Sequence, residues 1–273
     1  MRRVVETGIG AVTPVGNDMK TTWDNLVNGV SGIDFIPEER FSTEGLKVKI
    51  AGLVKDFEPT KYFEKKDLRK NDLYTQYAVA AATEAVEDSD ILGKIEEDNF
   101  GVYVGAGIGG LDSFYKNSIN MEKFGARKVS PFFIPMMIGN MASGTIAIKF
   151  KAKGPCVPIV TACATGANSI GEAFHAIRDG YCDAIITGGA EAAVSPLSIA
   201  GFQNCKALTT RNDPKRASIP FDKNRDGFVM GEGGACMILE EYEHAKARGA
   251  KIYAEIAGYG NTCDAHHITA PDA

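Results

Sequence analysis

The chain has 273 residues, of which 44% are hydrophobic and 24% charged, as in a globular protein with a sizeable core. Its formal net charge of −5 at pH 7 gives no general case for nucleic-acid binding, and no stretch approaches the roughly 20 apolar residues of a membrane span. Six cysteines are scattered without paired spacing. We therefore expect a cytoplasmic protein with reduced thiols.

Alternating strand and helix patterns run through the first 150 residues. Gly29 stands where a helix over 18–29 would end, because glycine adopts the left-handed conformation that closes helices. Alanine-rich spacing predicts a helix over 72–89. In chain order the expected elements are a strand at 2–10, the helix at 18–29, loops to about residue 58, the helix at 72–89, a strand at 100–110 and a helix at 138–150.

The second part of the chain predicts the same alternation. Apolar residues recur at helical spacing between Ile170 and Ile177, which predicts a helix after residue 163. The other expected elements are strands at 156–160 and 182–187, loops from 190 to 234, a strand at 235–242, a helix at 243–249 and a strand at 251–260. The alternation predicts an α/β fold with a largely parallel sheet. Pro158 lacks an N–H, so the strand at 156–160 should lie at an edge or carry a bulge.

Cys163 lies at the junction between the expected strand at 156–160 and the helix that follows. The N-terminus of a helix has free N–H groups and partial positive charge, which favour a thiolate and can bind an oxyanion. This position suits a nucleophile. The alternative is a buried cysteine that acts as a small hydrophobic side chain, and the residues alone leave both interpretations open.

Two short motifs suggest ligand sites that their surroundings do not support. The sequence GAGIGG at 105–110 has the spacing of a dinucleotide-binding loop, but it leads to the proline-broken RKVSPFFIPMM rather than to a helix. The sequence DKNRDGFVMGEG at 222–233 resembles a calcium loop, but Gly233 stands where the bidentate acid is required. Adjacent His266 and His267 have no supporting cluster of cysteines or acids. We therefore expect no dinucleotide, calcium or other metal.

Four longer motifs occur in the order typical of one family: RKVSPFFIP, IGNMASG, VTACATGANSIGEAFHAIRDGYCDAIITGGAEA and NDPKRASIPFDKNRDGFVMGEGG. Through them the chain resembles, over essentially its whole length, the elongating 3-oxoacyl-[acyl-carrier-protein] synthases of bacteria (synthase 2). These are beta-ketoacyl synthases of the thiolase-like superfamily. The resemblance implies an α/β fold with αβαβα layers made of two similar halves, and a homodimer. We expect residues 1–250 to form the complete N-terminal half and residues 251–273 to begin the second half.

The resemblance implies an acyltransferase with a two-step reaction. Cys163 would accept the acyl chain as a thioester, and its backbone N–H would supply one donor of the oxyanion hole. A carbanion made by decarboxylating malonyl-carrier protein would then extend the chain in fatty acid biosynthesis. No resident cofactor is implied, because the substrates are carried on the 4′-phosphopantetheine of acyl carrier protein.

The resemblance also implies two sets of binding residues. The residues expected to contact the acyl chain or the pantetheine arm are Ile108, Phe133, Ile134, Phe202, His267 and Thr269. The basic residues expected to dock the acidic carrier protein are Lys65, Lys66, Arg69, Lys70, Arg127, Lys128 and Lys206. Core packing and an ordinary solvated charged surface are the respective alternatives.

Related proteins share these motifs but differ in function. A polyketide ketosynthase has the same motifs, and a non-catalytic chain-length partner subunit usually lacks the cysteine. A thiolase proper would use acyl-CoA. Condensation in the family also requires two histidines, a lysine and a phenylalanine of its second half, which nothing in this sequence matches. We therefore expect the sequence to represent the front two-thirds of a synthase and to lack condensation on its own.

Overall fold

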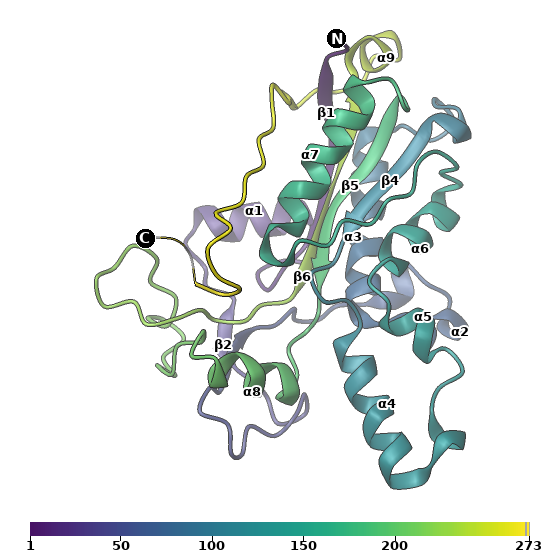
Figure 1. Ribbon diagram of the computed structural model, residues 1–273. Coiled ribbons are helices and arrows are strands. Elements are labelled where there is room, and N and C mark those ends of the chain that lie inside the picture. The colour runs from purple at the N-terminus through teal and green to yellow at the C-terminus, as the bar shows by residue number, and fades with distance from the viewer. Residues whose placement is uncertain (271, 273) are drawn as a thin grey trace.

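The computed structural model describes residues 1–270 and 272 (Figure 1). The strands are β1 Val4–Val12, β2 Ile33–Phe35, β3 Ile50–Gly52, β4 Phe100–Gly105, β5 Ala184–Glu191, β6 Gly233–Glu241 and β7 Ala254–Glu255. The α-helices are α1 Met19–Val27, α2 Lys65–Leu68, α3 Leu73–Ser89, α4 Leu111–Phe124, α5 Phe133–Met137, α6 Met141–Phe150, α7 Thr165–Arg178, α8 Pro196–Asn204 and α9 Tyr242–Ala247. Short 3₁₀ turns are η1 Pro59–Lys61, η2 Glu97–Asn99, η3 Ala126–Lys128 and η4 Ala162–Ala164.

The first two long helices begin and end where the sequence predicts. The carboxylate of Asp18 accepts a hydrogen bond from the Thr21 N–H (2.6 Å) at the start of α1, and Asp72 caps α3 in the same way. Gly29 follows α1 with φ 68°, the left-handed conformation expected after a helix.

The main sheet has the strand order β4-β5-β6-β1-β7. Among the described strands of this sheet, β4 and β5 run parallel, with Val102 opposite Ile186, while each of the other neighbouring pairs is antiparallel. The expectation of a largely parallel sheet is therefore wrong. The long connection after β5 contains α8 and brings β6 back antiparallel beside β5, which an alternating order of elements does not exclude.

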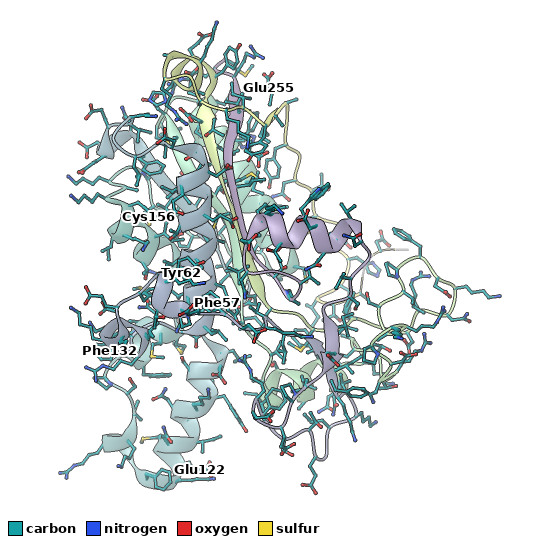
Figure 2. All side chains as sticks on the ribbon, turned by 180° about the vertical axis from the view of Figure 1, so that it is seen from behind. Phe57, Tyr62, Glu122, Phe132, Cys156 and Glu255 are labelled. Atoms are coloured by element: carbon teal, nitrogen blue, oxygen red, sulfur yellow. The ribbon has the colours of Figure 1, made fainter. Side chains whose placement is uncertain are left out.

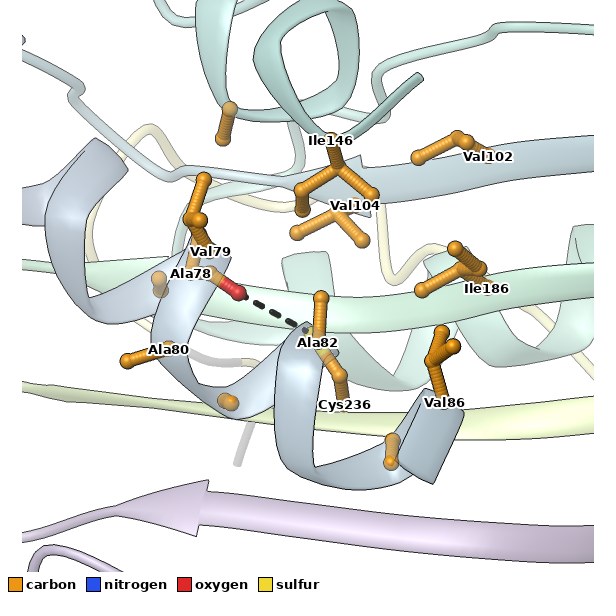
Figure 3. Packing of buried hydrophobic residues seen from close by; sticks show 14 of the residues in the cluster. Ala78, Val79, Ala80, Ala82, Val86, Val102, Val104, Ile146, Ile186 and Cys236 are labelled. Atoms are coloured by element: carbon orange, nitrogen blue, oxygen red, sulfur yellow. Dashed lines mark hydrogen bonds between the residues drawn. The ribbon is translucent and has the colours of Figure 1, made fainter. Parts of the chain in front are cut away.

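Helices cover both faces of this sheet (Figure 1). Alternate residues of a strand point to opposite faces, and the two large clusters of buried residues follow this alternation. Val102 and Ile186 pack with α3 and α6, whereas Tyr103 and Ile185 pack with α7. Figure 3 shows the α3 side, where Cys236 also lies. The sheet is thus the middle of three layers.

At two glycines the strand β1 approaches the backbone of α3 directly. A Cβ atom at Gly8 would lie 2.2 Å from the Ala85 carbonyl oxygen, and one at Gly10 would lie 2.2 Å from the Ala81 carbonyl oxygen. Only glycine fits at such a distance. The helix and the strand therefore pack backbone against backbone.

The segment at 156–160 is not the regular strand that the sequence predicts. The Val102 N–H donates to the Pro155 carbonyl (2.8 Å), and the Val157 N–H donates to the Val102 carbonyl (3.1 Å). These bonds place the segment beside β4, the end strand of the sheet order. Pro158 follows directly and has no N–H with which to continue the ladder. The edge position expected for Pro158 is confirmed.

Other regions read as loops contain structure. The stretch before residue 58 holds the antiparallel pair β2 and β3, and the stretch between 190 and 234 holds α8 with a reciprocal cap between Ser195 and Ser198. The helix α4 begins at Leu111, directly after the glycine loop, where the sequence predicted none. The strand expected at 251–260 is short, and β7 pairs with β1 in the main sheet. Within the described residues, no helix has the length and apolar character needed to cross a membrane.

Candidate active site

Cys163 lies in the middle of the turn η4, and α7 begins two residues later at Thr165. Its side chain is exposed. Ala162 before it has φ 50°, in the left-handed region that residues other than glycine rarely adopt. The predicted helix therefore does begin after Cys163. The segment before Cys163, at 156–160, is an irregular sheet edge and not the predicted strand.

Small residues bring the strand β4 against this turn. A Cβ atom at Gly105 would lie 2.3 Å from the Ile159 carbonyl oxygen and 2.3 Å from the side chain of Thr165. Gly107 lies beside the carbonyl of Ala162, where a Cβ atom would be at 3.1 Å. The glycines of the GAGIGG sequence therefore allow close packing against the cysteine turn.

A cavity of about 880 Å³ opens beside Cys163. Its lining is predominantly apolar and glycine-rich, with contributions from the ends of β1, β4, β5 and β6 and the start of α7. Ile108 and Phe202, two of the predicted chain-binding residues, line it together with Cys163. A cavity of this size and polarity suits an apolar ligand.

Glu191, at the end of β5, holds the glycine loop that forms one wall. Its carboxylate accepts hydrogen bonds from the Ile108 N–H (2.8 Å) and the Gly109 N–H (3.1 Å). Burial raises the pKa of Glu191, although these N–H donors act in the opposite direction. A helix does follow this loop, contrary to the sequence analysis, but Glu191 occupies N–H groups that a dinucleotide phosphate would need.

Glu232 holds another wall of the cavity. It is buried, and its carboxylate accepts hydrogen bonds from the Tyr77 hydroxyl (3.0 Å) and from the Arg40 guanidinium (3.0 Å). Burial raises the pKa of Glu232, and the Arg40 charge partly opposes this shift. Among the described residues, no group of three or more histidine, cysteine, aspartate or glutamate side chains could hold a metal ion.

Burial distinguishes Cys163 from two other cysteines. Cys182 and Cys236 are buried, and desolvation raises the pKa of each thiol to about 12. Burial also raises the pKa of Cys156. Cys163 and Cys236 both line the cavity, but only Cys163 is exposed, at the start of a helix. This placement favours the nucleophile over the inert small hydrophobic side chain.

The other predicted chain-binding residues lie outside the lining of this cavity. Phe133 and Ile134 begin α5, where the Phe133 ring lies 6.3 Å from that of Phe114. His267 and Thr269 are exposed near the end of the described chain, where the His267 ring accepts a hydrogen bond from the Thr269 N–H (3.2 Å). Their binding roles stay predictions.

The predicted docking residues form two neighbouring groups and one separate residue. Lys65, Lys66, Arg69 and Lys70 lie in and after α2, and Arg127 and Lys128 lie in η3. The Lys70 ammonium lies 5.9 Å from the ring centre of Phe132, which follows η3 in the chain. Lys206 follows α8 with φ 59°. Apart from the half-buried Lys70, these residues are exposed.

None of the histidines, all of which the structure describes, lines the cavity. His175 lies in the last turns of α7, too far along the helix to act on Cys163. The His244 ring is half-buried and lies 2.6 Å from the buried Glu240 carboxylate.

The sequence analysis missed Glu191 and Glu232 as site residues. Both occur inside quoted motifs: Glu232 stands between two glycines in GEGG, and Glu191 stands between two alanines in GGAEA. An acid flanked by glycine or alanine in an apolar stretch is a usable signal, because a buried carboxylate needs backbone N–H donors. The partners could not be identified from the sequence, since Ile108 is 83 residues from Glu191.

Comparisons with known proteins agree with this geometry. The family model described as the N-terminal domain of beta-ketoacyl synthases matches residues 1–245. A 3-oxoacyl-[acyl-carrier-protein] synthase 2 of Staphylococcus aureus (strain COL) is 51% identical over 271 residues, and one of Vibrio harveyi is 50% identical over 274 residues. Each alignment covers 99% of this chain and 65% of the relative. The chain thus spans less than two thirds of these relatives' length.

Solved structures are similar as well. A beta-ketoacyl synthase from Burkholderia phymatum STM815 has a TM-score of 0.89 at 34% identity, covering 99% of this chain and 67% of that one. A type II polyketide ketosynthase, in complex with its acyl-carrier protein and bound to the hexaketide, has a TM-score of 0.86 at 34% identity. That match covers 97% of this chain and 64% of the other. The thiolase-like α/β class expected from the sequence is confirmed.

Proposed function

Because the chain belongs to the beta-ketoacyl synthase family, we propose that it accepts an acyl group from acyl carrier protein on Cys163. This is the first half of the reaction of a 3-oxoacyl-[acyl-carrier-protein] synthase. The observation that carries the proposal is the position of Cys163, exposed at the start of α7 beside an apolar cavity.

The transfer exchanges one thioester for another. The Cys163 thiolate attacks the carbonyl carbon of the acyl-pantetheine, and the tetrahedral oxyanion forms beside the backbone N–H groups at the helix start. The carbon–sulfur bond to pantetheine then breaks, and its thiolate takes up a proton. The cavity accommodates the apolar chain, with Ile108 and Phe202 in contact with it. Phe133, Ile134, His267 and Thr269 are proposed contacts on the same path.

Condensation completes the reaction of the whole enzyme. Malonyl-carrier protein loses carbon dioxide, the resulting carbanion attacks the thioester carbonyl, and the Cys163 thiolate leaves. The substrates of both steps arrive on the 4′-phosphopantetheine of acyl carrier protein, and no resident cofactor takes part. We place the enzyme in fatty acid elongation rather than polyketide synthesis, because the synthase 2 relatives are 50–51% identical and the polyketide ketosynthase 34%.

Intact-mass analysis tests the acyl transfer. After incubation with octanoyl-carrier protein, the 273-residue chain should gain the mass of one octanoyl group, and hydroxylamine should remove it. Cys163→Ser should not form this adduct under the same conditions. Cys263→Ser is the matched control, because Cys263 is also exposed but lies outside the cavity lining. A thioester adduct that persists in Cys163→Ser would refute the assignment.

The carrier protein should bind the basic residues of α2 and η3. Replacing Lys65, Lys66, Arg127 and Lys128 with glutamate should raise the half-saturating concentration of octanoyl-carrier protein in acylation and leave acylation by a small octanoyl thioester nearly unaffected. Salt should weaken docking in the same way, because exposed charges are screened over about 8–10 Å at physiological ionic strength. An equal loss on both substrates would contradict docking. Arg69 and Lys70 are proposed to dock with the residues of α2, and Lys206 is proposed as a separate docking contact after α8.

A homodimer through the edge segment is proposed in addition. Val157 and Val160 are 41% and 60% exposed at the outer edge of the sheet, and an exposed apolar edge favours pairing with a second strand. Val160→Lys should shift the mass measured by light scattering from dimer to monomer. A dimer that persists unchanged in this variant would contradict this interface. The six free thiols suit a reducing compartment, and we place the protein in the cytoplasm.

A further inference from the structure

The segment from 253 to 260 fixes a tyrosine against the helix that begins next to Cys163. The Ile256 N–H donates to the Val4 carbonyl (2.9 Å), which attaches the segment to β1. Farther along, the Tyr259 ring packs on Gly171 of α7 so closely that a Cβ atom there would lie 2.3 Å from it. The ring also meets His175 edge to face, with 5.4 Å between centres. The Tyr259 side chain is therefore placed accurately on α7.

The Tyr259 hydroxyl begins a chain of hydrogen bonds that ends at the cysteine turn. It accepts a hydrogen bond from the side-chain amide of Asn168. The amide oxygen of Asn168 accepts a hydrogen bond from the Thr161 hydroxyl (2.7 Å). Asn168 is buried, so its amide has both of these partners in a place where an unpaired group would be costly.

Thr161 is the residue from which the turn starts. Its N–H donates to the Thr165 hydroxyl (2.9 Å), and its carbonyl accepts a hydrogen bond from the Ala164 N–H (3.0 Å). With the bond to Asn168, Thr161 is therefore held by its side chain, its N–H and its carbonyl. Ala162 then adopts φ 50°. A left-handed residue other than glycine persists only where its surroundings hold it.

We propose that Tyr259 is a positioning residue for the nucleophile: through Asn168 and Thr161, its hydroxyl holds the turn that carries Cys163 and the backbone N–H of Cys163. This inference rests on the proposed acyl transfer, in which that N–H stabilises the oxyanion. Tyr259 lies outside the residues 1–245 that match the family model. The segment at 253–260 thus takes part in the active site without lining the cavity.

A purely structural Tyr259 would anchor the segment and affect only stability. Two substitutions separate the alternatives, because each removes one hydroxyl and keeps the side-chain volume: Tyr259→Phe and Thr161→Val. Tyr253→Phe is the matched control. Tyr253 lies on the same segment, and its hydroxyl bonds Asp88 (2.7 Å), away from α7.

Hydrogen exchange of the peptide 158–166 measures the turn directly. It contains the N–H groups of Thr161 and Ala164, which are hydrogen-bonded in the structure. We expect about tenfold faster exchange in Tyr259→Phe and in Thr161→Val, and no change in Tyr253→Phe. The double variant should equal either single one, because residues of one hydrogen-bond chain are not additive. Exchange at the wild-type rate in Tyr259→Phe, or in the control to the same extent, would overturn the proposal.

Two reactions of Cys163 distinguish a misplaced oxyanion donor from a change in access to the thiol. Both are measured in a chain whose Cys156, Cys205 and Cys263 are replaced by alanine. With octanoyl-N-acetylcysteamine, Tyr259→Phe should lower the saturating acylation rate by about tenfold and leave the half-saturating concentration unchanged, because the oxyanion donor is misplaced. Alkylation by iodoacetamide forms no oxyanion and should keep its rate. Equal losses in both reactions, or none in acylation, would overturn the proposal. If the unmutated chain forms no acyl adduct, the proposed function fails, and the exchange measurement still decides whether Tyr259 holds the turn.

Discussion

Removing the Glu191 carboxylate should release the glycine loop that separates the cavity from α4. In Glu191→Ala, the N–H groups of Ile108 and Gly109 lose their acceptor, and Gly107 loses a neighbour beside the cysteine turn. The wall that Ile108 contributes should then become mobile. Glu191→Gln keeps one acceptor oxygen and removes the charge, so its effect should be intermediate.

The size of the effect follows from the two hydrogen bonds. Each hydrogen bond contributes about 0.5–1.5 kcal/mol when the carboxyl is neutral, and bonds to the charged form contribute about 1.5–3 kcal/mol. Burial of the charged form more than offsets this gain, since burial raises the pKa of Glu191. We expect a net loss of about 1–3 kcal/mol in the free energy of unfolding at about pH 5, or about 3–8 °C in Tm for a chain of this size. A raised pKa means that the stabilisation is fully present at low pH and declines as the pH rises, so the loss should be smaller at about pH 8 than at about pH 5.

Urea unfolding followed by circular dichroism measures the loss in the free energy of unfolding. The rates of acylation with octanoyl and butyryl thioesters show whether the cavity wall still selects for chain length. Glu191→Ala should lose part of its discrimination between the two chain lengths. Glu122→Ala is the control, because Glu122 is exposed at the far end of α4 (Figure 2). If Glu191→Ala unfolds at the same urea concentration as this control, the carboxylate does not hold the loop.

Three further predictions concern the scaffold. Burial raises the pKa of Glu240, but hydrogen bonds from Arg248 and its neighbours outweigh burial and keep the pKa below its usual value. Arg248→Ala should therefore lower the free energy of unfolding by about 3–5 kcal/mol at pH 8, as measured by urea unfolding. This loss should shrink as the pH falls through the ordinary carboxyl pKa of about 4.3. A loss that does not depend on pH would contradict the prediction. Gly171→Ala should displace the Tyr259 ring and lower the free energy of unfolding by about 1–3 kcal/mol. Chymotrypsin should then cleave faster after Tyr259. An unchanged cleavage rate would show that the ring moves aside freely. Burial raises the pKa of Cys236 to about 12, so only about 10⁻⁴ of its thiol should be ionised at pH 8. Cys236 should therefore resist iodoacetamide until the protein unfolds. Labelling of the native protein would show that this thiol is accessible.

The sequence predicted the elements whose signals are local. The cap Asp72 and the alanine spacing of α3 lie within a few residues of each other, and the position of Cys163 before α7 follows from adjacent patterns. Strand direction is not a local property. The antiparallel course of β6 depends on how the chain returns after α8, and no periodicity in β5 or β6 encodes it.

The residues that support the cysteine turn could not be predicted from the sequence for a similar reason. Asn168 and Tyr259 are 91 residues apart, and their contact depends on the path of the segment after β7. The helix α4 was not predicted, because its stretch is mostly polar and Gly110 before it offers no side-chain cap. The prediction of Ile108 and Phe202 came from family resemblance, and the cavity brings both beside Cys163.

The backbone contact between β1 and α3 has a consequence for how this protein tolerates mutation. An interface made of main-chain atoms has no rotamers to freeze, so its formation costs little side-chain entropy. At Gly8 and Gly10 the nearest atoms are main-chain carbonyl oxygens of α3, which cannot be shortened or repacked to absorb a change. A saturation library should therefore find Gly8 and Gly10 nearly invariant, while exposed positions such as Glu87 on the outer side of α3 accept most residues. Engineering of the cavity rim that shifts β1 must move α3 with it as one rigid piece.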